Sequence, residues 1–213
     1  MIFGKKTNQD YTARYISKTE TPEIYLEVAF SGGAERPGEK NPEKTDVVAR
    51  CLRKVNKFSP NSPWVESWRQ EYGNPIMPSG AWNGVKLVEI SASRGFLGIG
   101  NRLMEITADS ATPQWILETG NTPIYHIMRS EKKELMIVFN GYYGFKHKEH
   151  LGNICAVNME GREIWRAHLP HESDIFANAP YYDNGILKSA SWNGFTCAID
   201  EETGNITEKV FTK

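Results

Sequence analysis

The C-terminal part of the chain alternates short apolar segments with turn residues. The segment Ile154-Cys155-Ala156-Val157-Asn158, followed by Gly161, is echoed by Thr196-Cys197-Ala198-Ile199-Asp200, followed by Gly204. One short sheet cannot bury its faces alone, so a repeated unit of this kind is expected to stack on copies of itself. The repeat therefore predicts the fold class before any single residue is given a role.

The last repeat predicts a four-stranded antiparallel sheet. Asn184-Gly185 and Asn193-Gly194 are tight hairpin signals, and a Glu-Glu-Thr-Gly turn precedes the final apolar segment. The predicted strands are a segment ending at Tyr181-Tyr182-Asp183, then Ile186 to Trp192, Phe195 to Asp200, and Ile206 to Phe211.

Two earlier repeats follow the same plan, and each carries an insertion. The middle repeat, Pro123 to Ala167, has predicted strands at Leu135–Phe139, Asn153–Asn158 and Glu163–Arg166, with an insertion at Asn140–Gly152. The first repeat, from about Pro78, has the turn Trp82-Asn83-Gly84, then Val85–Ser91, Arg102–Thr107 and Gln114–Glu118, with an insertion at Ser93–Asn101. The equivalent positions Thr107, Asn158 and Asp200 are 51 and then 42 residues apart, a spacing typical of propeller blades.

The repeat pattern resembles a known family, the quinoprotein-type (PQQ-like) β-propeller blade. Such a blade has Ala-hydrophobic-Asp on its third strand, a short turn with Gly, and a last strand with Trp. The matching positions are Ala198-Ile199-Asp200 and Gly204 in the last repeat, Ala156-Val157-Asn158, Gly161 and Trp165 in the middle one, and Glu105-Ile106-Thr107 and Trp115 in the first. Near the Trp position the last repeat has Glu208.

This resemblance covers about residues 75–213. It implies a mainly β fold, a small irregular β-propeller-like array of four-stranded antiparallel sheets. It implies no particular function, since propellers host many functions. It implies no quinone cofactor either, because three repeats are far fewer than a quinoprotein dehydrogenase requires.

Residues 1–74 lie outside the repeats. Strands are predicted at Tyr11–Ser17 and Ile24–Phe30, and two short helices at Asp46–Asn56 and Ser62–Gly73. The first helix is predicted from apolar residues at helical spacing, and the second from an N-terminal Ser-Pro and from Trp64, Trp68 and Tyr72, which lie four apart. Three sheets cannot close a propeller. We therefore expect residues 1–74 to supply a fourth sector of a single domain over residues 1–213, with an N-terminal strand pairing near the last repeat.

Charge and composition narrow the function classes. Lys and Arg number 25 and Asp and Glu 26, so no overall basic field attracts nucleic acid. No run approaches 18 apolar residues and the N-terminus lacks a long apolar core, so we expect neither membrane insertion nor secretion, and a cytoplasmic location. The three cysteines are expected to be buried thiols, because the cytosol is reducing.

Motifs for catalysis are sparse. His147-x-x-His150 and His168-x-x-His171 could hold zinc if their loops met, but we interpret them as solvated loop histidines and predict no metal site and no cofactor. The chain has no nucleophile elbow, Walker loop or His-Glu-x-x-His motif. The glycine-rich stretch Gly95–Gly100 is interpreted as a bulged hairpin. No residue is assigned a catalytic role.

The predicted partner-binding residues lie in one insertion and one connecting segment. Tyr142, Tyr143, Phe145 and Lys146 belong to the insertion Asn140–Gly152, and Glu172 and Asp174 belong to the segment Leu169–Phe176. Large amphipathic side chains are enriched at interface centres, and an acidic loop suits a basic partner. Packing between sheets is the alternative for the aromatic residues.

These features favour a protein-binding module without catalytic activity. The sharper hypothesis comes from the association of such small proteins with bacterial toxin systems, not from a motif. It is an immunity protein that neutralises a cognate toxin, such as a contact-dependent growth inhibition nuclease, by occluding its active site. The alternatives are a metal-dependent hydrolase that uses the paired histidines, and a small-ligand or carbohydrate-binding propeller that uses Trp82, Trp192 and the tyrosines. We expect no direct contact with nucleic acid or membrane.

Overall fold

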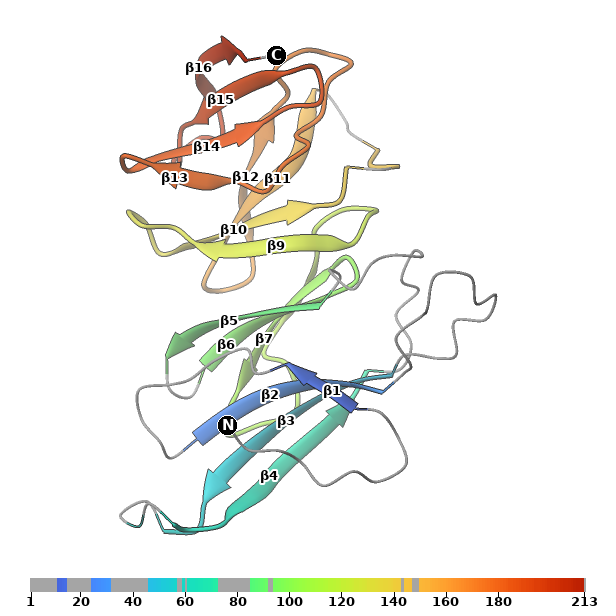
Figure 1. The fold of residues 1–213 in the computed structure, drawn as a ribbon, viewed down its shortest axis with the longest axis vertical. Coiled ribbons are helices and arrows are strands. Elements are labelled where there is room, and N and C mark those ends of the chain that lie inside the picture. The colour runs from blue at the N-terminus through green and yellow to red at the C-terminus, as the bar shows by residue number, and fades with distance from the viewer. Residues whose placement is uncertain are drawn as a thin grey trace. The chain divides into compact units, whose positions relative to one another are not determined.

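The chain folds mainly as β-sheet. The computed structural model describes residues 11–14, 24–31, 46–56, 59, 61–72, 85–91, 94–142, 144–146 and 150–212. These residues form sixteen strands and no helix (Figure 1), so no described helix could cross a membrane. The chain divides into two compact units, one of residues 1–76, 89–95 and 106–113, the other of residues 77–88, 96–105 and 114–213. The single domain expected from the sequence stays a prediction.

Every four successive strands form one sheet, with the strands in chain order. The first sheet contains β1 (Tyr11–Arg14), β2 (Ile24–Ser31), β3 (Asp46–Lys54) and β4 (Trp64–Glu71). The second contains β5 (Val85–Ser91), β6 (Arg94–Ile99), β7 (Arg102–Thr107) and β8 (Ile116–Glu118). Successive four-stranded meanders are the unit from which β-propellers are built.

The third and fourth sheets confirm the predictions for the middle and last repeats. The third contains β9 (Ile124–Arg129), β10 (Leu135–Asn140), β11 (Leu151–Asn158) and β12 (Glu163–His168). The fourth contains β13 (Tyr181–Asp183), β14 (Ile186–Ala190), β15 (Phe195–Ile199) and β16 (Ile206–Phe211). Asn184 and Gly185 both have positive φ, 51° and 71°, as a two-residue hairpin turn of type I′ requires.

The two helices predicted near the N-terminus are wrong. Asp46–Asn56 contains strand β3, and Ser62–Gly73 contains strand β4. The spacing of four between Trp64 and Trp68 fits one face of a helix. In the strand they pair with Lys54 and Cys51, and the register shift between Leu52 and Cys51 places the two tryptophans on opposite faces of the sheet. In β4 both tryptophans are half-buried, while Val65, Glu66 and Ser67 between them are exposed. Pairing along β3 decides in favour of the strand.

The insertion predicted at Ser93–Asn101 is also wrong, because this segment contains the buried strand β6. Its glycines led to the interpretation as an insertion that forms a bulged hairpin. Gly98 instead allows a close approach to the third sheet, since a Cβ at this position would lie 2.9 Å from Ile127 Cδ1. Glycine in a strand often marks such an approach. The second sheet consequently begins with Val85–Ser91 as its first strand.

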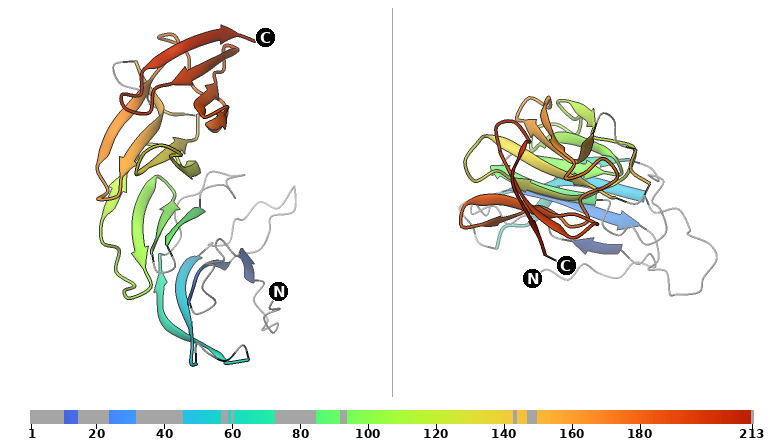
Figure 2. Two further views of the ribbon diagram at one scale, coloured as in Figure 1. Left: turned by 90° about the vertical axis from the view of Figure 1, so that its left-hand side faces the viewer. Right: turned by 90° about the horizontal axis from the view of Figure 1, so that it is seen from above.

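A hydrophobic core joins the third and fourth sheets, which lie side by side (Figure 2). Strands β10, β11 and β12 contribute one side of this core, and β14 and β15 contribute the other. The buried residues are Ile137, Phe139, Ile154, Ala156, Trp165, Ala167, Phe176, Leu187, Cys197 and Ile199. Cys155 is also buried, on the opposite face of β11, and the thiols of Cys51, Cys155 and Cys197 are free.

Within the second unit, tryptophan rings of one sheet pack on glycines in the turns of the next. Trp165 of β12 packs on Gly204 in the β15–β16 turn, where a Cβ would lie 2.7 Å from its Cε3 atom. Its Nε1 donates a hydrogen bond to the Glu201 carbonyl at 2.8 Å. Trp115, which precedes β8, packs in the same way on Gly161 in the β11–β12 turn. Each contact is possible only because the turn residue has no side chain.

The Glu201 carboxylate adds a polar link between the same two sheets. It is buried and accepts hydrogen bonds from the hydroxyls of Ser130 and Tyr182. Burial, followed by the bond to Glu201, raises the pKa of Tyr182 above its usual value. Both bonds go to Oε2, and the Lys132 ammonium lies 3.8 Å from Oε1, so two donors and an opposite charge offset the burial of this carboxylate.

In the first unit, side chains of β3 and β4 donate hydrogen bonds to carbonyls at the end of β7 and just after it. The Nε1 of Trp68 on β4 donates to the carbonyls of Thr107 and Ala108, both at 3.1 Å, and Arg53 donates to the Ala108 carbonyl at 2.9 Å. In the described part of the chain β1 pairs with β2, and β16 pairs with β15. The pairing of an N-terminal strand near the last repeat stays a prediction.

The tryptophan–glycine contact gives a stability test. Gly204→Ala should lower the free energy of unfolding by about 1–3 kcal/mol more than Gly185→Ala, because its Cβ overlaps Trp165 while that at Gly185 meets nothing within 4 Å. Both glycines have positive φ, 74° and 71°, so the backbone strain is matched. Urea unfolding measures the difference. Equal losses in the two variants would contradict the proposed role of the contact.

Candidate functional site

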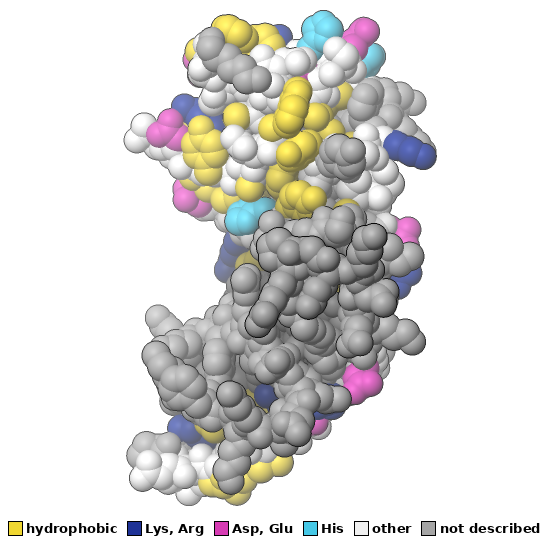
Figure 3. Space-filling view, turned by 45° about the vertical axis from the view of Figure 1, so that its right-hand side comes forward, with side chains coloured by type: hydrophobic (Ala, Val, Ile, Leu, Met, Phe, Trp, Pro, Cys, Tyr) yellow, Lys and Arg dark blue, Asp and Glu magenta, His cyan; other side chains and the backbone are white. Residues whose placement is uncertain are grey.

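Three segments of the second unit gather at one end of the sheets. In a four-stranded meander the turn between the second and third strands lies at the same end as the connection to the next sheet. The β10–β11 connection (residues 141–150), the β14–β15 turn (191–194) and the segment between β12 and β13 (169–180) therefore share this end. They hold the predicted partner-binding residues that the structure describes, namely Tyr142, Phe145, Lys146, Glu172 and Asp174. Figure 3 shows hydrophobic side chains gathered on one face of these C-terminal sheets.

An aromatic pair from two of these segments lies at the surface. The rings of Tyr142 and Trp192 have centroids 5.4 Å apart and planes inclined by 37°. Trp192 is 57% exposed, although its backbone N–H is fixed by a bond to the Ile175 carbonyl at 2.8 Å. Tyr142 is half-buried. The sequence named both residues, but only the fold brings them into contact.

Hydrogen bonds and one aromatic contact fix the segment that carries Tyr142. Asn121 accepts from the Lys146 backbone N–H and donates to the Gly144 carbonyl, both at 2.8 Å. Thr122 donates to the Gly141 carbonyl at 2.7 Å. Phe145 is half-buried and packs on Gly120, where a Cβ would lie 2.9 Å from its ring. Phe145 therefore anchors the segment, while the Lys146 side chain is exposed.

Buried asparagines support this end of the sheets. The amide of Asn140 donates to the Thr119 hydroxyl at 2.9 Å and to the Thr122 carbonyl at 2.8 Å. The amide of Asn153 donates to the carbonyls of Asn140 and Phe176 at 2.8 and 3.0 Å. Both side chains are fully buried. The network ties the second sheet, the third sheet and the segment before β13 together beneath the surface residues.

The two predicted acidic residues have different surroundings. Glu172 is exposed, whereas Asp174 is only 2% exposed. Asp174 Oδ1 accepts hydrogen bonds from the backbone N–H groups of Ile175 at 2.8 Å and Asn193 at 3.1 Å. Its burial leaves Asp174 a positioning role, because it joins the segment before β13 to the turn that carries Trp192. The sequence alone shows two nearby acids and does not separate these roles.

Two further predictions concern Tyr143 and the paired histidines. Tyr143 lies outside the described residues, as do His147 and its neighbours Lys148 and Glu149. His150, His168 and His171 are exposed. Among the described residues no group of three or more His, Cys, Asp or Glu side chains could hold a metal ion.

An open groove of about 470 Å³ lies beside β16, between residues 168–170 and 205–209. Lys209 crosses it, with Nζ donating to the Pro170 carbonyl at 3.0 Å and lying 5.0 Å from the centre of the Phe195 ring. No pattern in the sequence predicts this groove. It requires the last strand to lie beside the end of β12, which the bond from the His168 N–H to the Gly204 carbonyl at 3.1 Å shows.

Comparison with known proteins adds one family match. A family model described as a domain of unknown function (DUF7957) matches residues 121–211, which cover the third and fourth sheets and the candidate site. No curated protein matches the chain.

The solved structures that this chain resembles have low sequence identity to it and low TM-scores. The β-propeller domain of Cps50 (Swd1) from Myceliophteria_thermophila has 8% identity and a TM-score of 0.46, with 92% of this chain and 72% of that chain covered. The Mitotic Checkpoint Complex has a chain of 8% identity and TM-score 0.46, with coverages of 98% and 67%. BamB from Moraxella catarrhalis has 12% identity and TM-score 0.34, with coverages of 92% and 75%. At these scores the similarity carries no functional conclusion, and the architecture above rests on the strand pairing.

The buried thiols beneath the site should resist modification. Burial raises the pKa of Cys155 to about 12 and that of Cys197 to about 11, so little of the reactive thiolate forms near neutral pH. Iodoacetamide at pH 8 should therefore alkylate both cysteines far more slowly in the native protein than in guanidinium, as followed by mass spectrometry. Equal rates in the two conditions would show that the core is accessible.

The different roles of the two acids can be tested together. Asp174→Ala should lower the free energy of unfolding by about 1–3 kcal/mol, because two backbone N–H groups lose their acceptor in a partly buried place. Glu172→Ala, at an exposed position two residues away, should change it by no more than about 0.5 kcal/mol. Thermal or urea unfolding gives both values. An unchanged free energy of unfolding in Asp174→Ala would contradict the positioning role.

Proposed function

We propose that this chain is a non-catalytic protein-binding module whose contact surface is the end of the third and fourth sheets. The observation that carries the proposal is the Tyr142–Trp192 pair, with a largely exposed tryptophan on a backbone that is fixed by hydrogen bonds. Tryptophan and tyrosine are the residues most enriched among binding hot spots. A rigid support lowers the ordering cost of association.

The charges around the pair suit a partner of mixed or basic character. Glu172 and Lys146 are both exposed on segments that adjoin the aromatic pair. Exposed charges at the rim of an interface act mainly on partner choice and association rate. Phe145 and Asp174 support this surface from beneath.

The finer proposal is that the partner is a bacterial toxin. The chain would then be an immunity protein of the cytoplasm that occludes the toxin's active site, for example that of a contact-dependent growth inhibition nuclease. The exposed Glu172 lies on a segment that is hydrogen-bonded to the turn carrying Trp192, and this supports the proposal because a nuclease presents a basic surface to its substrate. The wider architecture would be a small irregular propeller of quinoprotein-type repeats. Contact between Trp165 and Gly204, two residue types named by that resemblance, supports this part of the proposal.

A small-ligand or carbohydrate-binding module is the second candidate. The exposed ring of Trp192 favours it, since a flat aromatic surface can also receive an apolar face of a small ligand. Soluble sugars that raise the melting temperature of the protein, and no longer do so in Trp192→Ala, would favour this candidate over protein binding.

The protein-binding proposal is tested by co-expression with the product of the gene immediately upstream. Affinity purification should recover that product in stoichiometric amount, and the product alone should be toxic to cells. Trp192→Ala should weaken the complex by about 10-fold to 100-fold, because truncation of a central aromatic anchor commonly has this effect. Surface plasmon resonance measures the change.

Ile164→Ala is the matched control. Ile164 is 50% exposed on β12, away from the aromatic pair, so its truncation should leave the affinity unchanged. No complex with the upstream product and no protection of cells would count against the toxin proposal. Equal losses in the two variants would count against the Tyr142–Trp192 surface.

A further inference from the structure

The third sheet buries one complete cross-strand row against the fourth. Strand pairing places Met128, Ile137, Ala156 and Trp165 opposite one another across β9, β10, β11 and β12. Directly opposite residues share a face of the sheet. Ile137, Ala156 and Trp165 belong to the buried core with the fourth sheet, and Met128 packs against it. This row therefore marks the face on which the next sheet stacks.

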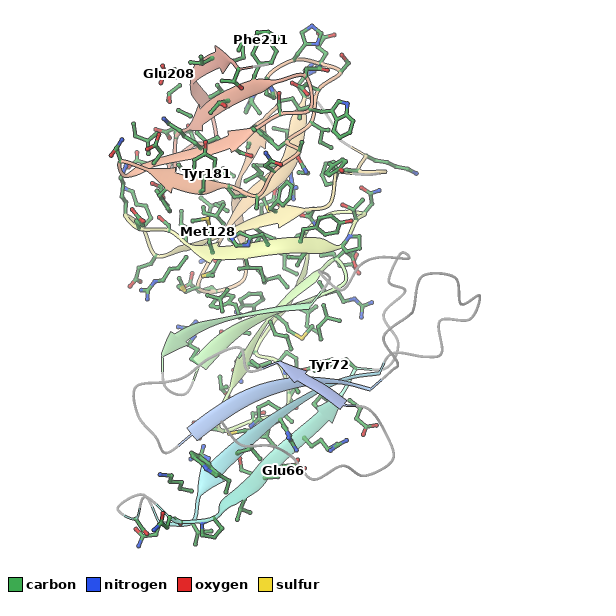
Figure 4. All side chains as sticks on the ribbon, in the orientation of Figure 1. Glu66, Tyr72, Met128, Tyr181, Glu208 and Phe211 are labelled. Carbon is green, nitrogen blue, oxygen red and sulfur yellow. The ribbon has the colours of Figure 1, made fainter. Side chains whose placement is uncertain are left out.

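The equivalent row of the fourth sheet has a different chemistry. Its members are Tyr181, Lys188, Ala198 and Glu208 across β13, β14, β15 and β16. Ala198 corresponds to Ala156, and Glu208 takes the place of the Trp165 ring. Figure 4 labels Met128 in the third sheet, and Tyr181 and Glu208 in the fourth. The stacking aromatic is thus replaced by a carboxylate on the last sheet.

Within the second unit this face of the fourth sheet carries exposed side chains, and they are not all polar. Asp183 and Ile186 face each other on it, as do Thr196 and Val210. Tyr181, Ile186 and Val210 are 44%, 43% and 48% exposed. The end repeat of an array needs only a polar outer face to stay soluble. Large, exposed apolar side chains beside charged ones on one sheet face are a feature of contact surfaces.

The charges on this face are unbalanced. Lys188 forms an ion pair with Asp183 at 2.8 Å. Within the described part of the chain no ion pair engages Glu208, which is exposed. Two carboxylates and one ammonium group leave an excess of one negative charge on the face. A cation supplied from outside is its electrostatic complement.

We propose that the outer face of the fourth sheet is a second docking surface, and that its occupant is a protein segment that presents an arginine or lysine to Glu208 among apolar side chains. This surface lies on the sheet face, whereas the Tyr142–Trp192 surface lies at the sheet end, so the inference does not depend on the proposed function. A second copy of this chain fits less well. Two such faces brought together about a twofold axis would double the excess negative charge.

The test uses the full chain and two synthetic seven-residue peptides with blocked ends. One alternates valine with arginine, and the other has glutamate in place of arginine. Titration followed by ¹⁵N NMR should show the arginine peptide shifting the amide signals of Tyr181, Ile186 and Val210, and the glutamate peptide leaving them unchanged. Glu208→Lys should weaken binding of the arginine peptide by about fivefold or more, and Glu208→Gln by less.

Glu134→Lys is the matched control. Glu134 is exposed in the β9–β10 turn, so this variant makes the same change in net charge away from the face. It should leave binding of the arginine peptide unchanged. Equal weakening by Glu134→Lys and Glu208→Lys would overturn the proposal, as would equal binding of the two peptides or no binding at millimolar concentration. A molar mass that rises with protein concentration, and no longer does so in Glu208→Lys, would assign the face to a second copy and also overturn it.

Discussion

The packing of a tryptophan ring from one sheet on a glycine in the turn of the next is the contact on which the C-terminal unit depends. A four-stranded sheet of about 40 residues has two faces and cannot bury both by itself. Trp115 on Gly161 and Trp165 on Gly204 bring successive sheets into contact at one end, and the apolar rows between the sheets then close. Because protein interiors are tightly packed, a single added methyl group at either glycine disturbs this arrangement.

This contact also determines where function can be placed. The turns that receive the tryptophans lie at one end of the sheets, and that end is occupied by packing. The opposite end carries the longer connections, and buried Asn140 and Asn153 hold these connections to the sheets. Side chains on these connections can face solvent, while the asparagine hydrogen bonds fix the backbone beneath them. Tyr142 and Trp192 consequently form the best candidate for a contact surface.

The chemistry of the stacking face differs between the third sheet and the fourth. In the third sheet the row that ends in Trp165 is apolar and buried, and in the fourth the same row ends in Glu208 and includes Lys188. A charged row does not stack on another sheet without partners for its charges. The last sheet therefore presents a face unlike the others, with apolar side chains around an unbalanced carboxylate.

The sequence by itself determined most strands of the last two repeats, because apolar segments separated by turn residues, and the Asn-Gly turns of the last repeat, are local signals. It did not determine β3, β4 or β6. A spacing of four favours a helix, because the register shift that places Trp64 and Trp68 on opposite faces of a strand depends on pairing with β3. The glycines of β6 favour an insertion until the neighbouring sheet packs on them. The sequence placed Asp174 and Glu172 in one group, but burial separates them. Contacts between residues such as Tyr142 and Trp192, fifty positions apart, depend on sheet stacking, so only the tertiary structure decided them.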